Sequence, residues 1–534
     1  MIKILVADPL DKEGLKKIEE VPGVQADVRP GLKEDELAAA VGEYDGMIVR
    51  SGAKVTAKVL AQPGKLRAIA RAGVGVDNID LKAATQAGVL VMNTPDANTL
   101  STAEHAMALM LALSRHVPAA DVHVRERKWK RGDYMGTQLA GKVLGIIGLG
   151  RVGTAVAQRA LSFGMKIIAY DPFYSAETAL DGKVKLLKSR DEVFAQADYL
   201  SLHTHLSDET KGMINRDNIA KMQDGVRIIN CSRGPVINDA DLAEALASGK
   251  VAGAAIDVYA TEPPTPDNPL LSAPHTVLTP HLGASTEEAQ LAVTLDAVDA
   301  LLCYLVKDEI RWAVNVTGLP SQLSPRDKAY LDLARRMGIL MSHLGTGVIE
   351  SIKVTTHGES LELLGGTLQK QFLVDMLSPG FGTRLNLINV YNFAKQRGIK
   401  LEQSADLSSS AVTDRVTFAI QTRDGEHEIS GVIFIDGLPH ITAVSGYAMD
   451  LVPAGEMVVI LNHDEPGVIG LVGTIFGNHR INIADMTLSR QKDTALMVLK
   501  LDAPMPKAAL EELQARKPVI MKVLPVTLPP LGNG

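Results

Sequence analysis

Short apolar runs of strand length alternate with helical stretches along the first part of the chain. Up to residue 95, helical periodicity covers 15–19, 33–41 and 81–87, and apolar runs cover 3–7, 46–49, 66–70 and 89–92. This alternation predicts a parallel sheet with helices on both of its faces. A second series of apolar runs predicts another sheet of the same kind, with strands at 143–147, 166–170, 199–202, 227–230, 253–257 and 276–278.

Two long helices are expected to connect these sheets. One should begin at Ser101, where the run Ser-Thr-Ala-Glu up to Glu104 has the pattern of a capping box. Its residues 106–113 are apolar on every side, which predicts burial between two domains. The other helix, 287–305, returns the chain to the first sheet. We therefore expect an inserted domain at 98–285 within a first domain made of 1–97 and 286–313.

The pattern changes from residue 314 onward. Residues 314–451 mix helices and strands, which predicts an α+β domain, and 319–326 have the Pro and Ser content of a linker. Residues 456–524 follow the order strand, helix, strand, strand, helix, strand. This βαββαβ pattern predicts an antiparallel sheet with helices on one face, within a domain at 452–534. The Pro- and Gly-rich tail from Pro525 is expected to fray.

The composition excludes several classes of function. The chain has 534 residues and a net charge of −7, so it lacks the basic surface that nucleic acids and anionic membranes attract. No apolar run approaches the roughly 18 residues of a membrane span. Only Cys231 and Cys303 are present, which argues against a disulfide framework and a thiolate metal cluster. We expect a soluble cytoplasmic protein of several domains with no metal site.

A glycine-rich loop lies between an apolar run and a helical stretch, with the sequence GLGRVG at 148–153. Gly148 would permit a tight turn, Gly150 would let backbone N–H groups approach a pyrophosphate, and Gly153 would let helix and strand pack closely. The positive end of the helix would face the anion. A glycine turn in some other α/β unit is the simpler alternative, but the order strand, loop, helix favours a dinucleotide site.

Asp171 follows the next apolar run and indicates which dinucleotide binds. A carboxylate at this position accepts hydrogen bonds from a ribose diol and repels a 2′-phosphate. The residues after it, 172–175, include no Lys or Arg. The sequence therefore predicts NAD rather than NADP.

Polar side chains follow several of the predicted strands. Oxidation of an alcohol by NAD needs a base, and histidine suits this role because its ordinary pKa is about 6.5. Arginine suits a substrate carboxylate, and a carboxyl group beside the imidazole fixes its tautomer. His281, Arg233 and Glu262 are residues of these types at strand ends. By position alone, a structural histidine is an equal alternative.

Two further basic features each have a functional and a structural interpretation. Arg50 directly follows an apolar run and is either an anion contact or a solvated surface residue. Residues 125–131 form a basic cluster that contains Trp129. This cluster is either a solvated face or a surface for a second subunit or for anion steering.

Longer motifs around these residues resemble the D-2-hydroxyacid dehydrogenase family. They are AGVGVDNID at 72–80, NCSRGPVIND at 230–239, GAAIDVYATEPP at 253–264 and TPHLGASTEEAQ at 279–290, with the glycine loop and Asp171. Within this family, VRSGAKVT at 49–56 and NTPDANTLSTAEH at 93–105 are similar to the long branch that oxidises 3-phospho-D-glycerate. The segment VILNHDEPGVIGLVGTIFGNHRINIADMTLSR at 459–490 resembles an ACT domain, which is a small-molecule regulatory module.

The resemblance implies a fold and an activity. The fold would be a flavodoxin-like substrate domain with an inserted Rossmann domain, then an intervening allosteric substrate-binding domain at 314–451 and the ACT domain. The activity would be NAD-dependent oxidation of 3-phospho-D-glycerate to 3-phosphohydroxypyruvate, the first step of L-serine biosynthesis. A homodimer or homotetramer is implied, with L-serine as the candidate effector.

The resemblance also implies roles for individual residues. His281 would accept the proton of the C2 hydroxyl, with Glu262 as its hydrogen-bonded partner and Arg233 as the clamp on the substrate. The phosphorylated acid would also contact Arg50, Ser51, Gly75 and Asn98. The cofactor would contact Val74, Gly148, Gly150, Arg151, Val152, Gly153, Asp171, Thr204, Cys231, Ser232, Arg233, Asp257, His281, Leu282, Gly283 and Ala284. Residues 129–131 would approach a neighbouring subunit's cleft, and the effector would contact Asn462, Asp464 and Asn482.

The sequence leaves two questions of function open. The substrate is either 3-phospho-D-glycerate or another D-2-hydroxy acid, and the same fold also occurs in cofactor-sensing binding proteins such as transcriptional corepressors. Ala97 stands where members of the family commonly have glycine, and Asn462 and Asp464 stand where serine-inhibited relatives often have His and Asn. Because an acid at Asp464 would repel a carboxylate, the effector's identity stays open.

Overall fold

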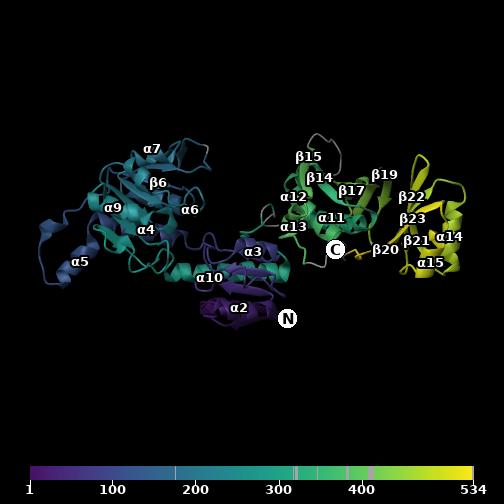
Figure 1. Ribbon diagram of the computed structural model, residues 1–534, viewed down its shortest axis with the longest axis horizontal. Helices are drawn as coiled ribbons and strands as arrows, with labels where there is room; N and C mark the ends of the chain where they lie inside the picture. The colour runs from purple at the N-terminus through teal and green to yellow at the C-terminus, as the bar shows by residue number, and fades with distance from the viewer. Residues whose placement is uncertain are drawn as a thin grey trace.

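The structure is a computed structural model that describes residues 1–174, 176–316, 318, 323–345, 347–380, 384–406 and 414–531. The chain forms four sheets arranged along an elongated molecule (Figure 1). The sheet that carries the glycine loop lies at one end, the sheet formed by the N-terminal residues lies next to it, and the two C-terminal sheets form the other end. The predicted combination of fold classes is confirmed.

The first sheet is parallel and has the strand order β2-β1-β3-β4-β5, which is the flavodoxin-like order. Its strands are β1 (Ile2–Val6), β2 (Val24–Val28), β3 (Gly46–Val49), β4 (Ala68–Arg71) and β5 (Leu90–Met92). The helices between them are α1 (Lys12–Glu19), α2 (Glu34–Ala40) and α3 (Leu81–Gln86). Strand β3 is buried at every position, as a strand covered on both faces requires.

The second sheet has the order β13-β12-β11-β10-β6-β7-β9-β8 and is parallel except for the pair β8 and β9. Its strands are β6 (Val143–Ile147), β7 (Lys166–Tyr170), β8 (Thr178–Ala179), β9 (Val184–Leu186), β10 (Tyr199–Leu202), β11 (Val226–Asn230), β12 (Val251–Ile256) and β13 (Thr276–Leu278). Helices α6 (Arg151–Ser162), α7 (Arg190–Phe194), α8 (Arg216–Ala220) and α9 (Asp239–Ser248) join them. The crevice for a ligand lies beyond the carboxyl ends of such strands.

Helices α4 (Thr99–Ser114) and α10 (Glu287–Lys307) connect the two sheets. The predicted capping box is wrong, because α4 begins two residues before Ser101. The Ser101 hydroxyl instead contacts the Thr286 hydroxyl at 2.7 Å, and Glu104 pairs with Arg159. Both side chains therefore contact residues that are distant in the sequence instead of capping the helix.

Helix α10 is long and apolar enough to cross a membrane by length and composition alone, but many of its apolar residues pack in the core of the first sheet.

Helix α5 (Val117–Arg125) projects from the end of the molecule, away from its own sheet (Figure 1). None of its residues is buried, and Val117, Val122 and Val124 are each more than half exposed. Trp129, in the basic cluster that follows, is 78% exposed. Two of the cluster's charges are paired locally, Arg125 with Asp121 and Lys128 with Glu126.

The third sheet has the order β15-β14-β16-β17-β18-β19. Its strands are β14 (Ile349–His357), β15 (Lys400–Asp406), β16 (Arg415–Thr422), β17 (Gly425–Ile433), β18 (Pro439–Val444) and β19 (Tyr447–Leu451). Helices α11 (Pro325–Leu344), α12 (Gly365–Leu377) and α13 (Val390–Gln396) complete this α+β unit. Of the predicted linker, residues 319–322 lie outside the described residues. The end of that stretch, from Pro325, already belongs to α11.

The fourth sheet is antiparallel, with the order β21-β22-β20-β23. It contains β20 (Gly455–His463), β21 (Ile483–Gln491), β22 (Thr494–Leu501) and β23 (Ile520–Leu528), with α14 (Val468–Asn478) and α15 (Lys507–Gln514) on one face. The predicted βαββαβ order is confirmed. The expected fraying from Pro525 is wrong, because β23 continues to Leu528. Strand β23 pairs only with β20, and an edge strand tolerates a proline that cannot donate a hydrogen bond.

The third and fourth sheets share one hydrophobic core, which we call the ACT junction. Met457, Val459, Val498 and Val526 of the fourth sheet belong to the same buried cluster as α11 and the third sheet. Arg336 of α11 is 1% exposed in this junction. Its head group donates to Asp332 and to the carbonyl groups of Pro453, Pro529 and Pro530, at 2.6–3.0 Å. Arg336 thus joins α11 to the segment that precedes β20 and to the segment that follows β23.

Candidate functional site

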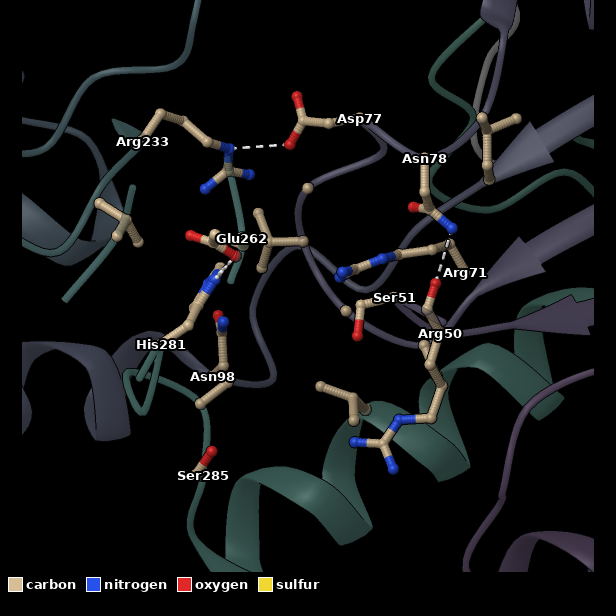
Figure 2. Close-up of a pocket in the computed structure, with 18 of the residues that line it drawn as sticks. Arg50, Ser51, Arg71, Asp77, Asn78, Asn98, Arg233, Glu262, His281 and Ser285 are labelled. Carbon is tan, nitrogen blue, oxygen red and sulfur yellow. Dashed lines mark hydrogen bonds and ion pairs between the residues drawn. The ribbon is translucent and has the colours of Figure 1, made fainter. Parts of the chain in front are cut away.

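A cavity of about 1720 Å³ lies between the first and second sheets, beyond the carboxyl ends of their strands. Segments that are far apart in the sequence line it: the turns after β3, β4 and β12, the turn that precedes α10, and the start of α10. Figure 2 shows its side chains converging on a central space. Among the residues singled out from the sequence, those that line it are Arg50, Ser51, Val74, Gly75, Asn98, Arg233, Glu262, His281 and Ala284.

His281 and Glu262 meet in this cavity. The Nδ1 atom of His281 lies 2.7 Å from a carboxylate oxygen of Glu262, and Glu262 also accepts a hydrogen bond from the Tyr259 backbone N–H. Because the carboxylate accepts from Nδ1, the neutral ring presents the lone pair of Nε2 to a ligand. The two residues come from different loops, so the fold creates this pair.

The pKa values of the two groups move in opposite directions. The hydrogen bond from His281 to Glu262 raises the pKa of His281 above its ordinary value and outweighs the effect of burial. Burial alone would raise the pKa of Glu262, but its hydrogen bonds from His281 and Tyr259 N–H lower it. Glu262 therefore remains an anion that stabilises the protonated imidazole.

Asp257 fixes the loop that carries His281. Its side chain is fully buried and accepts hydrogen bonds from the backbone N–H groups of Leu282 and Gly283 and from the Thr279 hydroxyl, at 2.6–2.9 Å. His105 of α4 lies 3.1 Å from the same carboxylate. His105 is the last residue of the motif at 93–105. Its role depends on the contact with Asp257, which the sequence does not reveal.

Arg233, in the loop after β11, lines the same cavity near Glu262 and His281 (Figure 2). Its Nε donates to Asp77 at 2.9 Å and its NH1 group donates to the Ser232 carbonyl at 2.7 Å. Asp77 belongs to the first sheet's loops and Arg233 to the second sheet's, so this ion pair bridges the two units. A Cβ atom added to Gly75 would lie 2.0 Å from the NH2 atom of Arg233. Glycine at this position therefore leaves room for the guanidinium.

The glycine loop has the geometry that a dinucleotide needs. Gly148 has a φ of +91°, and a Cβ atom there would lie 2.4 Å from the His203 carbonyl oxygen. A Cβ atom on Gly153 would lie 2.1 Å from the Gly148 carbonyl oxygen, whereas Gly150 faces open space at the start of α6. Asp171 accepts a hydrogen bond from the Leu149 backbone N–H at 2.8 Å, which places its carboxylate beside the loop.

Other cofactor candidates lie around the same crevice. The Thr204 hydroxyl is buried and has no hydrogen-bond partner among the described residues, and such a group suits a bound ligand. Cys231 is buried, which raises the pKa of its thiol well above its ordinary value. Ser232 donates to Asn230, and the Val74 carbonyl accepts from Asn93. Arg151 and Val152 begin α6, and Arg151 pairs with Asp96 of the first sheet's unit.

The substrate candidates occupy different parts of the cavity. Ser51 and Asn98 line it, and in the part of the chain that the structure describes, the side-chain oxygen of Asn98 is buried without a hydrogen-bond partner. Arg50 extends toward α10, away from the pair formed by His281 and Glu262 (Figure 2). Sequence reasoning missed Arg71, which ends β4 and points into the cavity. The predicted strand stopped at Ala70, one residue short, so the sequence pattern did not place Arg71 at a strand end.

The three effector candidates do not meet within one chain. Asn462 and Asp464 lie at the end of β20, where Asp464 pairs with Arg490 and the Asn462 side-chain oxygen is buried with no partner in the described ranges. Asn482 donates to Asp502 and precedes β21, which lies beside the start of β20 across β22. At a strand rise of about 3.3 Å per residue, the two ends of β20 are roughly 20 Å apart.

Three family models match separate parts of this chain. The NAD binding domain of the D-isomer specific 2-hydroxyacid dehydrogenases matches residues 107–283. The intervening domain of D-3-phosphoglycerate dehydrogenase matches 326–445, and the ACT domain matches 457–517. The three matches follow the second, third and fourth sheets in order.

Full-length relatives match nearly all of the chain. D-3-phosphoglycerate dehydrogenase from Synechocystis sp. is 39% identical over 516 residues, which are 96% of this chain and 92% of that protein. The enzymes of the same name from Archaeoglobus fulgidus and Bacillus subtilis are 40% and 37% identical, over 96% and 99% of this chain and 97% and 100% of those proteins.

Solved structures resemble the first two units. The TT0316 protein from Thermus thermophilus is 34% identical, with a TM-score of 0.54, and covers 59% of this chain and 100% of that chain. An NAD-dependent formate dehydrogenase from Staphylococcus aureus, solved in complex with NAD, is 27% identical, with a TM-score of 0.52, and covers 58% and 97%. With the full-length relatives, these matches show that the chain belongs to the D-3-phosphoglycerate dehydrogenase family of NAD-dependent D-2-hydroxyacid dehydrogenases.

Proposed function

We propose that this chain oxidises 3-phospho-D-glycerate to 3-phosphohydroxypyruvate with NAD, and so performs the first step of L-serine biosynthesis. The observation that carries the proposal is the 2.7 Å contact between His281 and Glu262, in a cavity that Arg233 and further arginines also line. The names of the full-length relatives supply the substrate.

The residues have distinct roles in this reaction. The Nε2 atom of His281 takes the proton of the C2 hydroxyl while the C2–H bond breaks and its electron pair leaves as hydride. Glu262 holds the ring through Nδ1 and stabilises the imidazolium that forms. Arg233 binds the substrate carboxylate with donors that Asp77 and the Ser232 carbonyl leave free.

The second sheet's residues fit NAD. When bound, NAD supplies the acceptor for the hydride. Gly150 leaves open space for the pyrophosphate at the start of α6, and Asp171 beside the loop would hold the ribose diol. The buried Thr204 hydroxyl and the turn from Leu282 to Ala284, held by Asp257, would support the nicotinamide half.

A direct assay tests the activity. Purified full-length protein is mixed with NAD and 3-phospho-D-glycerate at alkaline pH, and NADH formation is followed by absorbance. We expect turnover that depends on both compounds. Turnover of D-lactate or D-glycerate without turnover of 3-phospho-D-glycerate would replace the proposed substrate with another D-2-hydroxy acid.

Regulation and assembly form the second part of the proposal. The four units would divide at 1–97 with 286–313, 98–285, 314–451 and 452–534, and a small molecule such as L-serine would bind the last unit. Asn462 lies at the end of β20, whereas Asn482 lies near the level of its start. A site that uses both residues therefore requires two copies of the chain. The exposed valines of α5 would pack against a second copy, in a cytoplasmic homodimer or homotetramer.

A ligand screen with a sizing measurement tests this second part. We expect one L-amino acid to raise the melting temperature of the full-length protein, because a ligand that binds only the folded state stabilises it by mass action. Light scattering should give the mass of two or four chains. A monomer would exclude a shared effector site.

A further inference from the structure

Helix α4 contacts the segment that carries His281. This segment, residues 279–286, joins β13 to α10, and we call it the His281 loop. Three side chains of α4 contact it at 2.7–3.3 Å: Ser101 the Thr286 hydroxyl, Thr102 the Gly283 carbonyl and His105 the Thr279 hydroxyl. Helix positions spaced in this way share one side of the helix. One face of α4 therefore contacts the His281 loop from its first residue to its last.

His281 needs such support because its backbone is strained. Its φ is +57°, in the left-handed region that residues other than glycine seldom adopt. Such a conformation persists only where surrounding contacts impose it. The His281 backbone N–H donates to the Asp257 carbonyl at 2.9 Å, and the next two N–H groups donate to the Asp257 carboxylate. Asp257 therefore sets the backbone from which the imidazole extends.

The buried Asp257 carboxylate is in turn held from α4. The Nε2 atom of His105 lies 3.1 Å from it, and because an ionised carboxylate only accepts, this nitrogen carries the hydrogen. Burial alone would raise the pKa of Asp257, but the hydrogen bonds from His105, Thr279 and the Leu282 N–H lower it. Among the described donors to this carboxylate, His105 alone lies outside the His281 loop.

The other titratable groups near this pair belong to the site itself. Those that Asp257 affects, or that act on His281, are Cys231, Arg233, Tyr259 and Glu262. On α4, the neighbouring Glu104 pairs with Arg159 of α6 instead. In the part of the chain that the structure describes, Asp257 is thus the carboxylate within ion-pair distance of His105.

We propose that His105 is a positioning residue for the oxidation, because it holds the Asp257 carboxylate against the His281 loop and so keeps the imidazole on Glu262. This inference rests on the proposed function of His281 as the base. His105 is not among the residues that line the cavity, so its effect passes through Asp257. Because only the N–H group at Nε2 is used, a neutral amide should be able to replace it.

Two substitutions separate this hydrogen bond from the shape of the side chain. His105→Gln places an amide N–H near the position of Nε2, whereas His105→Leu fills similar space without a donor. With NAD and 3-phospho-D-glycerate, we expect kcat to fall by about 10- to 100-fold in His105→Leu, as the loss of a hydrogen bond to a charged group predicts. We expect a fall of less than about threefold in His105→Gln. Equal losses in both variants, or no loss in His105→Leu, would overturn the proposal.

The pH profile separates positioning from a general loss of structure. Without its support the loop should loosen the contact between His281 and Glu262, so the raised pKa of His281 should fall toward its ordinary value. The midpoint of the rise in kcat/KM for oxidation should therefore move to lower pH in His105→Leu and stay in place in His105→Gln. A protein that is only less folded would lose activity equally at every pH, so an unchanged midpoint in His105→Leu would contradict the proposal.

Chemical modification gives the same midpoint without turnover. Diethyl pyrocarbonate acylates the neutral imidazole, and the His281 side chain is half exposed. The rate of its modification against pH, followed by mass spectrometry of the peptide, should give a lower midpoint in His105→Leu and the wild-type midpoint in His105→Gln. A wild-type protein that leaves 3-phospho-D-glycerate unoxidised would refute the proposed function. An unshifted midpoint in His105→Leu would refute the role of His105, which is a different result.

Glu104→Gln supplies the matched control. Glu104 is adjacent to His105 on α4, but it pairs with Arg159 and does not contact the His281 loop. Its variant should keep the wild-type kcat and pH midpoint. The melting temperatures of the three variants measure folding. A large fall in the melting temperature of His105→Leu with an unchanged midpoint would show that His105 is only structural.

Discussion

The cavity between the first two sheets and the ACT junction are both places where two units of the chain meet, but they differ in how polar groups are satisfied. The ACT junction is an apolar core, and its buried Arg336 has an acceptor for each group that donates. In the cavity, the Arg71 Nε atom and the side-chain oxygen of Asn98 are buried and find no hydrogen-bond partner among the residues that the structure describes. The unpaired atoms lie where a ligand is expected.

This difference separates a fixed interface from a binding site. Buried polar groups without partners are costly, so a protein retains them where a ligand completes the hydrogen bonds. Two ion pairs with exposed carboxylates join the first two units, Arg233 with Asp77 in the cavity and Arg151 with Asp96 beside the glycine loop. Ion pairs with exposed partners typically contribute about 0–1 kcal/mol, so they hold the two units together less firmly than a buried apolar core does.

The largest effect is expected from His281→Gln in the cavity. Loss of the base should lower kcat for oxidation by about 1000-fold, while the affinity for NAD changes little. Stopped-flow or steady-state NADH absorbance measures the rate, and fluorescence titration measures NAD binding. The exposed His275, just before β13, is the matched control, and His275→Gln should keep full activity. A fall of less than tenfold for His281→Gln would contradict the role of base.

Arg336→Met in the ACT junction should change stability instead of turnover. The variant leaves the carbonyl groups of Pro453, Pro529 and Pro530 without their donor, which should cost about 3 kcal/mol of unfolding free energy in the C-terminal half. Urea unfolding followed by circular dichroism measures this loss. Arg335→Met is the control, since Arg335 is half exposed and 3.8 Å from Asp375. A large fall in the basal kcat of Arg336→Met would show that the ACT junction affects turnover as well as stability, which would contradict the comparison.

The pH dependence tests the coupling inside the cavity. Glu262 raises the pKa of His281, so the imidazolium persists above pH 6.5 and the neutral base appears only at higher pH. kcat/KM for oxidation should therefore rise with pH through this raised pKa and then level off, while reduction should show the opposite trend. Glu262→Gln removes the charge, so the rise should move to lower pH and the plateau should fall by about 10- to 100-fold. An unchanged midpoint in that variant would rule out the coupling.

The smallest effect is expected from Asn462→Ala in the fourth sheet. Among the described residues its buried oxygen has no partner, and its amide nitrogen donates only to the neighbouring His463 carbonyl, so truncation should cost about 1 kcal/mol of stability and leave basal kcat unchanged. The increase in melting temperature given by an effector should disappear. A variant that keeps this increase would place the effector site elsewhere in the molecule.

Several features follow from the sequence because they depend on neighbouring residues. Hydrophobic periodicity predicted the two parallel sheets, the α+β character of residues 314–451 and the βαββαβ order, and the glycine spacing predicted the dinucleotide loop, since each signal is a local pattern of residues. Local patterns failed where distant groups competed. Ser101 does not cap α4 because Thr286 takes its hydroxyl, and Pro525 lies in an edge strand because β20 pairs with it.

Which side chains face one another was decided by the tertiary structure alone. The sequence offered His281, Glu262 and Arg233 as residues of the right types, but the 2.7 Å contact and the bridge to Asp77 exist only because two sheets place their strand ends together. Among the described residues, the Arg71 Nε atom has no hydrogen-bond partner, and Asp77 and Asp8, which act on Arg71 electrostatically, accept from other donors. A hydrogen-bond partner is a property of three-dimensional distance, and for this reason the sequence determined the elements and the chemical groups while the fold determined which groups remain free to bind.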